Sequence, residues 1–125
     1  MGEERLHLCW VDVGKLAAWG HPESFEKRHN FPEYANWMWD QGAKPDLILI
    51  DGRFRIFCFL TSLLRACPRI LILFDDYSDR SVYHVVEEFL PVTDRCGRQA
   101  LFEVTSSARA LVDQELLLSF QNVTT

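Results

Sequence analysis

Polar side chains that could bind an anion or accept a proton follow three apolar runs of this sequence. Asp12 follows the first run, Asp-Gly-Arg-Phe-Arg at 51–55 follows the second, and Asp-Asp-Tyr at 75–77 follows the third. Carboxylates can act as general bases. Arginine guanidinium groups bind carboxylates and phosphates through paired N–H donors. A site that combines these functions requires the fold to bring the three segments together.

The segment at 51–55 is the most specific of the three. Gly52 permits a tight turn and a close approach of the main chain to a ligand. A helix that begins here would present unpaired N–H groups and a partial positive charge. Beside Arg53 and Arg55, those groups would suit a carboxylate or a phosphate. The structural alternative is that Asp51 caps the helix and that the arginines pair with the acids at 75 and 76.

Other kinds of site are less well supported by the sequence. Asp75 and Asp76 could share a proton or hold a divalent cation. Adjacent residues on a strand point to opposite faces, however, so we expect no metal site. Neither a Ser-His-Asp nor a Cys-His arrangement is identifiable. His7, His21 and His29 have no obvious partner in the sequence, and His84 is expected to be a surface or packing residue.

Alternating elements are predicted to position these residues. Expected strands cover 6–11, 46–50, 69–74 and 99–104, and expected helices cover 32–41, 53–67, the segment from Ser78 or Asp79 to Pro91, and 108–120. Runs of four aliphatic residues favour strands that are covered on both faces. Strands joined by helices are predicted to be parallel, so their carboxyl ends meet at one edge. We therefore expect a single α/β domain over 1–125, a three-layer, Rossmann-like, mostly parallel sheet flanked by helices.

Composition restricts the partners. The 125 residues carry a net charge of −5 without a basic stripe, which argues against nucleic-acid binding. No apolar run approaches the roughly 20 residues of a membrane span. Residues 1–5 are polar, which argues against a secretory signal and favours a cytoplasmic protein. The four cysteines form no Cys-x-x-Cys pair, and we expect Cys9 and Cys58 to be buried, reduced thiols.

A set of motifs occurs in order along the chain. They are Trp19-Gly20-x-Pro22, Tyr34, Trp37, the run Asp46–Arg55, and Phe74–Tyr77 with Arg80 and Tyr83. Over roughly Leu6 to Val104 the sequence thereby resembles a group of bacterial proteins related to class I S-adenosylmethionine-dependent methyltransferases. In that family, the strand before Asp12 looks like the third strand, near the adenine. The strands before Asp51 and Asp75 look like the fourth, which faces the methyl-transfer region, and the fifth.

The resemblance also implies roles for individual residues. Asp51 and Asp75 would be catalytic, and Asp12 and Gly52 would contact the cofactor. The residues implied for an anionic group or the substrate are Arg53, Arg55, Asp76, Tyr77 and Arg80. S-adenosylmethionine is the implied cofactor, and no metal is implied.

The sequence departs from the family in its cofactor loop. Class I methyltransferases carry a glycine-rich loop after the first strand and an acidic residue after the second, and this chain has no Gly-x-Gly segment. The resemblance therefore implies the C-terminal half of such a domain, either a fragment or a short relative, with cofactor binding weak or lost. Without the first two strands, the segment from Leu6 must pair with the strand at 46–50 or with another subunit. Because an unpaired apolar strand edge promotes association, we expect a homodimer or higher oligomer.

Three functions remain open at this stage. The first is a methyltransferase-like domain, with or without activity. The second is a non-enzymatic module that binds an anion or another protein at the same edge. The third is a signalling receiver domain, whose length and central Asp51 fit. A receiver would, however, carry an acidic pair where Asp12 stands alone and a lysine in the last strand, which 99–104 lacks.

Overall fold

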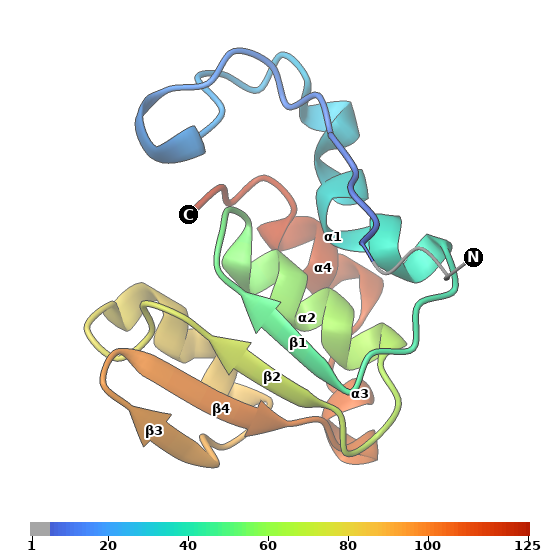
Figure 1. Ribbon diagram of the computed structural model, residues 1–125, viewed down its shortest axis with the longest axis vertical. Coiled ribbons are helices and arrows are strands. Elements are labelled where there is room, and N and C mark those ends of the chain that lie inside the picture. The colour runs from blue at the N-terminus through green and yellow to red at the C-terminus, as the bar shows by residue number, and fades with distance from the viewer. Residues whose placement is uncertain (1–5) are drawn as a thin grey trace.

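The structure, a computed structural model, describes residues 6–125, so the expectation for residues 1–5 lies outside its described part (Figure 1). Its single sheet has four strands in the order β1-β2-β4-β3. The strands are β1 (Leu47–Ile50), β2 (Leu71–Phe74), β3 (Asp94–Cys96) and β4 (Gln99–Glu103).

The sheet is mixed rather than mostly parallel. β1 and β2 are parallel, whereas β2–β4 and β3–β4 are antiparallel. β4 follows β3 through a short turn in which Gly97 has φ 58°, and strands joined by such a hairpin must be antiparallel. The short strand β3 was not predicted from the sequence.

Helical segments precede, connect and follow the strands. They are η1 (Ala18–Gly20), η2 (Arg28–Asn30), α1 (Phe31–Asp40), α2 (Arg55–Arg65), η3 (Ser81–Glu88), α3 (Ser106–Arg109) and α4 (Gln114–Phe120), where η denotes a 3₁₀ helix. The helix expected after Ser78 or Asp79 is the 3₁₀ segment η3, which has no side-chain cap. The helix expected over 108–120 is divided because Thr105 and Asp113 each cap a separate helix. Within residues 6–125, no helix has the length and apolar character needed to cross a membrane.

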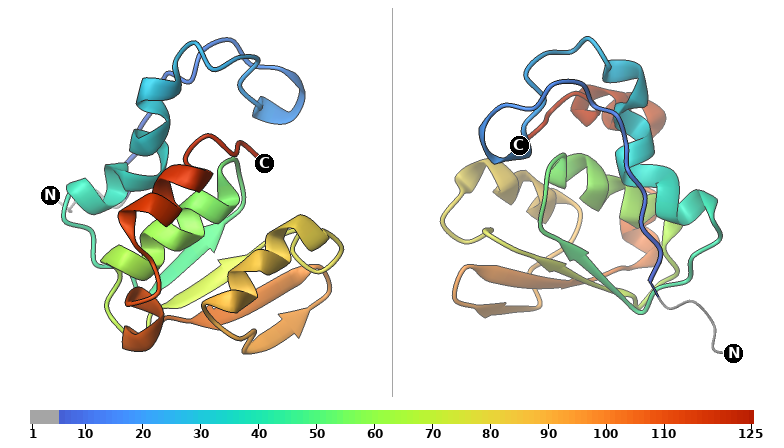
Figure 2. Two further views of the ribbon diagram at one scale, coloured as in Figure 1. Left: turned by 180° about the vertical axis from the view of Figure 1, so that it is seen from behind. Right: turned by 45° about the horizontal axis from the view of Figure 1, so that its top comes forward.

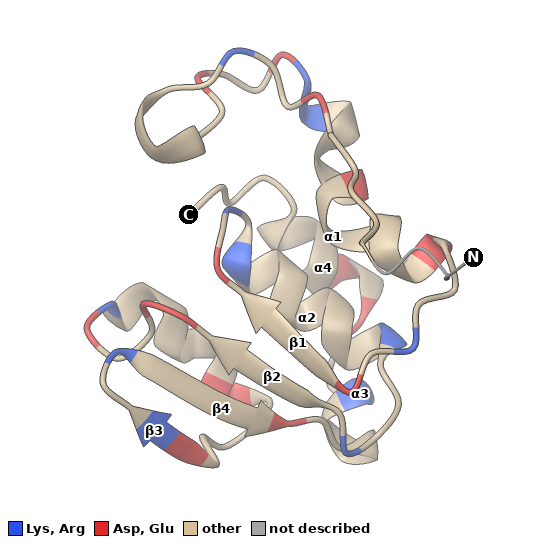
Figure 3. Ribbon diagram, in the orientation of Figure 1, with Lys and Arg blue, Asp and Glu red and all other residues tan. Residues whose placement is uncertain are grey.

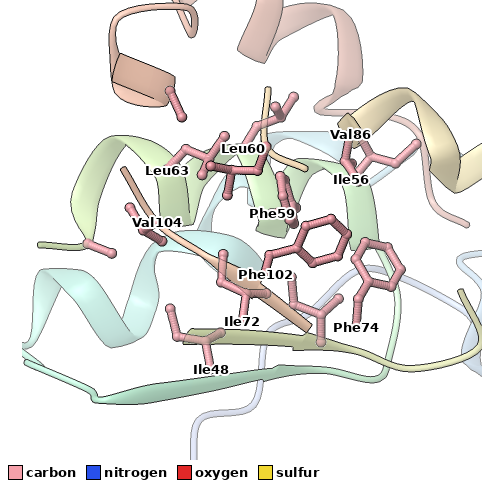
Figure 4. Close-up of a cluster of buried hydrophobic side chains, with 14 of the residues drawn as sticks. Ile48, Ile56, Phe59, Leu60, Leu63, Ile72, Phe74, Val86, Phe102 and Val104 are labelled. Atoms are coloured by element: carbon pink, nitrogen blue, oxygen red, sulfur yellow. The ribbon is translucent and has the colours of Figure 1, made fainter. Parts of the chain in front are cut away.

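α2 and the sheet form the main core (Figure 4). Ile48, Ile72 and Phe102 occupy one row across β1, β2 and β4, on the face that α2 covers. Phe59 of α2 is fully buried, and its ring centroid lies 5.0 Å from that of Phe102 and 6.2 Å from that of Phe74. This packing fixes α2 against β1 and β2, and thereby fixes the turn between β1 and α2.

The helices lie on one face of the sheet, which therefore has two layers rather than three (Figure 2). On the opposite face Leu47 is 55% exposed and Leu49 is 59% exposed. Their neighbours Leu71 and Leu73 on β2 are half-buried. The prediction that both aliphatic runs are covered on both faces is thus wrong, because the connections all cross on the same side.

The segment 6–11 is extended but forms no strand, contrary to prediction. It runs beside α1 and is not hydrogen-bonded to β1 (Figures 1 and 2). Leu8 is 82% exposed and Trp10 is 84% exposed. Cys9 is exposed rather than buried. No strand of the described chain lies beside this segment. Without a partner strand, its main-chain N–H and C=O groups cannot form the hydrogen bonds of a sheet.

Candidate functional site

A cleft of about 1760 Å³ opens at the carboxyl ends of β1 and β2, between these turns and the segment 6–13. Charged residues gather in the turns that follow the two strands (Figure 3). The predicted site residues that line the cleft are Asp51, Gly52, Arg53, Arg55, Asp75, Asp76 and Arg80. Arg98, which the sequence analysis did not single out, lines it as well. The parallel pairing of β1 and β2 explains why two of the three predicted segments meet.

Two predicted site residues lie elsewhere. Asp12 is not in the cleft lining; its carboxylate accepts a hydrogen bond from Gly14 N at 3.0 Å and lies 3.9 Å from Lys27. Tyr77 is fully buried, and its hydroxyl donates to Glu87 at 2.6 Å. Burial, followed by the negative charge and hydrogen bond of Glu87, raises the pKa of Tyr77. Asp12 thus stabilises a loop, and Tyr77 belongs to the core.

Arg55 is the buried centre of the site. Its side chain is 4% exposed. Nε donates to the Gly52 carbonyl at 2.9 Å and Nη1 donates to the Asp75 carbonyl at 2.6 Å. Nη2 lies 3.8 Å from the Asp51 carboxylate and 3.7 Å from that of Asp76. Arg55 therefore joins the turns after β1 and β2, and its donors are engaged within the chain.

Asp76 forms further ion pairs with arginines that line the cleft. Its carboxylate lies 3.9 Å from Arg80 and 3.6 Å from Arg98, in addition to Arg55. Its main chain adopts φ 53°, a left-handed conformation that is uncommon for a residue other than glycine. Such conformations persist only where the surrounding structure enforces them, and they are frequent at functional sites.

Asp75 is held as an ionised carboxylate. Burial alone would raise its pKa. Hydrogen bonds from the Gln99 side chain and the Asp76 main chain, with the charge of Arg55, hold the pKa below its ordinary value. The Gln99 bond measures 3.2 Å. At neutral pH Asp75 is therefore negatively charged.

The turn after β1 is fixed by aromatic packing and by the C-terminal segment. Phe54 has φ 54° and is fully buried, with its ring 4.8 Å from that of Phe31 and 5.1 Å from that of Tyr34. The N–H groups of Phe54 and Arg55 donate to the carbonyls of Thr124 and Thr125 at 3.1 and 3.0 Å. The N–H groups that were expected to face an anion at the start of α2 are thus paired within the chain.

The Tyr34 side chain lies so close to residue 52 that it favours glycine there. A Cβ atom at this position would lie 2.7 Å from the Tyr34 hydroxyl oxygen. That oxygen also accepts a hydrogen bond from Arg53 N at 3.2 Å. We expect Gly52→Ala to lower the free energy of unfolding by about 1–3 kcal/mol, the usual cost of overpacking.

Removing the hydroxyl should relieve most of this cost, because the next nearest Tyr34 atom, Cζ, would lie 3.9 Å from the added Cβ. In urea denaturation we therefore expect a smaller effect of Gly52→Ala in the Tyr34→Phe background than in the native one. An equal effect in both backgrounds would mean that contact with the hydroxyl is not the cause.

His21 joins three segments at the edge of the cleft. Its Nε2 lies 2.6 Å from Arg53 Nη1, and its Nδ1 lies 3.3 Å from the Thr124 hydroxyl. Burial and the charge of Arg53 lower the pKa of His21. Its partners lie 32 and 103 residues away in the sequence, so no local pattern could have revealed them.

Comparison with known proteins shows a similarity at the level of structure. No model of a known protein family matches the chain, and no curated protein matches it. Among solved structures, the chain is similar to a methyltransferase-like protein from Silicibacter pomeroyi DSS-3, with a TM-score of 0.77 and 34% sequence identity. The alignment covers 94% of this chain and 61% of that protein, so the chain spans about three fifths of its length. The chain has a methyltransferase-like fold.

Proposed function

We propose that the chain is a class I methyltransferase-like domain, equivalent to the C-terminal half, whose cleft binds a methyl acceptor and, without a glycine-rich loop, binds S-adenosylmethionine only weakly. The observation that carries the proposal is the meeting of Asp51, Asp75 and Arg53 in a cleft at the carboxyl ends of two parallel strands. Ligands of open α/β sheets bind at such edges. The similarity to a methyltransferase-like structure supports the same interpretation.

The size and the lining of the cleft support the proposal. Its volume of about 1760 Å³ exceeds the typical range of small-molecule pockets, which is about 300–1,000 Å³. Trp19 and Trp37 line it together with the charged rim, and indole rings can stack on an adenine ring. Arg53 can bind a ligand carboxylate. When bound, S-adenosylmethionine supplies an electrophilic methyl group.

The residues at the strand ends would serve the acceptor. The Asp51 side chain is 52% exposed and can accept a proton from an acceptor hydroxyl or amine. Asp75 is ionised and held by Gln99, so it can orient a donor group of the ligand. Arg55 and Asp76 would act indirectly, because their contacts hold these carboxylates in place.

Calorimetric titration with S-adenosylhomocysteine tests the proposal. We expect saturable binding, which Asp51→Asn weakens about tenfold, or about 1.4 kcal/mol. Arg95→Ala is the control, because Arg95 lies on β3 outside the cleft. If millimolar ligand gave neither binding heat nor an increase in thermal stability, the similarity to methyltransferases would concern the fold alone. Equal weakening by both variants would place the ligand elsewhere.

We also propose that the chain associates with a second copy of itself through the outer edge of β1. Within the described residues β1 pairs only with β2, and the exposed Leu47 and Leu49 lie beside the free edge. Lysine and proline, which protect edge strands, do not occur in Leu47–Ile50. Sedimentation velocity should detect a dimer that Leu49→Lys dissociates. A native chain that is monomeric at micromolar concentration would contradict this proposal.

A further inference from the structure

The structure assigns a further role to His21. We propose that neutral His21 is a positioning residue, which holds the Arg53 guanidinium at the cleft so that it binds an anionic group of the ligand, a carboxylate or a phosphate. Protonation of the imidazole would release Arg53 and weaken ligand binding. The inference rests on the proposed ligand cleft, and it adds a residue that positions Arg53 and a dependence of ligand binding on pH.

The geometry defines the tautomer of His21. A guanidinium group has no acceptor, so the 2.6 Å contact requires Arg53 Nη1 to donate to an unprotonated Nε2. In a neutral imidazole the proton then resides on Nδ1, which donates to the Thr124 hydroxyl at 3.3 Å. Both ring nitrogens are thus engaged, and His21 links Arg53 to the C-terminal segment.

Arg53 differs from Arg55 in what it binds. Arg55 lies near two carboxylates and donates to two carbonyls. Arg53, among residues 6–125, has no carboxylate within ion-pair distance, and its enclosed Nε has no hydrogen-bond partner. Its charge is therefore not neutralised by a contact in the described part of the chain. A cation at a cleft whose contact is a neutral imidazole is suited to an anion.

Protonation of His21 would replace its hydrogen bond with Arg53 by a repulsion between two donors. Imidazolium carries a proton on both nitrogens, so Nε2 would place a donor and a positive charge 2.6 Å from Arg53 Nη1. Lys15 and Glu23, at the base of the His21 loop, pair with each other at 3.6 Å. The segment 121–125 has no charged side chain. Of the two side chains that the imidazole contacts, Arg53 and Thr124, only Arg53 is charged, and it opposes protonation.

The test compares two substitutions over a range of pH. His21→Gln keeps an acceptor for Arg53 but does not titrate, whereas His21→Lys places a fixed positive charge there. The affinities for S-adenosylhomocysteine and for sulfate are measured between pH 5 and 7.5. We expect native affinity to fall about tenfold at the acidic end, His21→Gln to lose this dependence, and His21→Lys to bind about tenfold more weakly at pH 7.5. The same pH dependence in His21→Gln, or native affinity in His21→Lys, would overturn the inference.

A second readout separates this inference from the proposed function. Nitrogen-15 spectra of the histidine rings should show His21 as the Nδ1–H tautomer at pH 7.5, and its titration should move to higher pH in Arg53→Ala. Two tautomers in exchange, or a titration unchanged by Arg53→Ala, would overturn the positioning role even if ligands bind. If neither probe binds while the tautomer is as expected, the anion-binding role fails together with the proposed function.

Discussion

Replacing Arg55 with methionine is expected to lower the free energy of unfolding by about 3–5 kcal/mol, as measured by urea denaturation. Leaving a buried hydrogen-bond acceptor without its donor costs about 1–3 kcal/mol, and Arg55 donates to two main-chain carbonyls. Methionine fills a similar volume, but it leaves the Asp51 and Asp76 carboxylates without Arg55 and the Gly52 and Asp75 carbonyls without donors. The stability of Arg55→Lys should lie between that of the native chain and that of Arg55→Met. Lysine keeps the positive charge but lacks the planar guanidinium group with its paired donors.

Arg98→Met is the matched control. Arg98 also pairs with Asp76, at 3.6 Å, but its side chain is 70% exposed. Exposed ion pairs contribute about 0–1 kcal/mol, so the control should change stability little. Equal effects of the two substitutions would mean that Arg55 is not the buried centre of this network.

Replacing Phe59 with alanine is expected to lower the free energy of unfolding by about 3–5 kcal/mol, the usual cost of a large-to-small change in a core. The Phe59 side chain belongs to α2 and is fully buried against the rings of Phe74 and Phe102. The same variant should lose ligand affinity at temperatures where it is folded, since α2 positions Arg55.

Phe25→Ala provides the comparison, because Phe25 is 54% exposed. Its substitution should cost well under half as much. A Phe59→Ala variant as stable as Phe25→Ala would contradict the assignment of the main core to the interface between α2 and the sheet.

The sequence predicted the elements whose signals are local. Pro32 and Gly42 bound α1 as expected, with Gly42 at φ 79°. Two aliphatic runs mark β1 and β2, and the apolar segment between them forms α2. Since β1 and β2 are parallel, the meeting of the residues that follow them could also be predicted.

Features that depend on contacts between residues far apart in the sequence could not be predicted. The aliphatic runs do not reveal that the helices all pack on one face, because Leu47 and Ile48 are equally apolar. The segment 6–11 has a strand-like composition, yet a strand needs a partner, and none lies beside it in the described chain. The His21–Arg53 contact likewise depends on how two loops pack.

A nitrogen-15 NMR titration of the native chain with S-adenosylhomocysteine tests the central claim most directly. That claim is that the residues after β1 and β2 form one ligand site. We predict that the main-chain signals of Gly52, Arg53 and Asp76 shift together with a single dissociation constant, while those of β3 stay in place. Signals that shift only around β3, or no shifts at saturating ligand, would contradict the account.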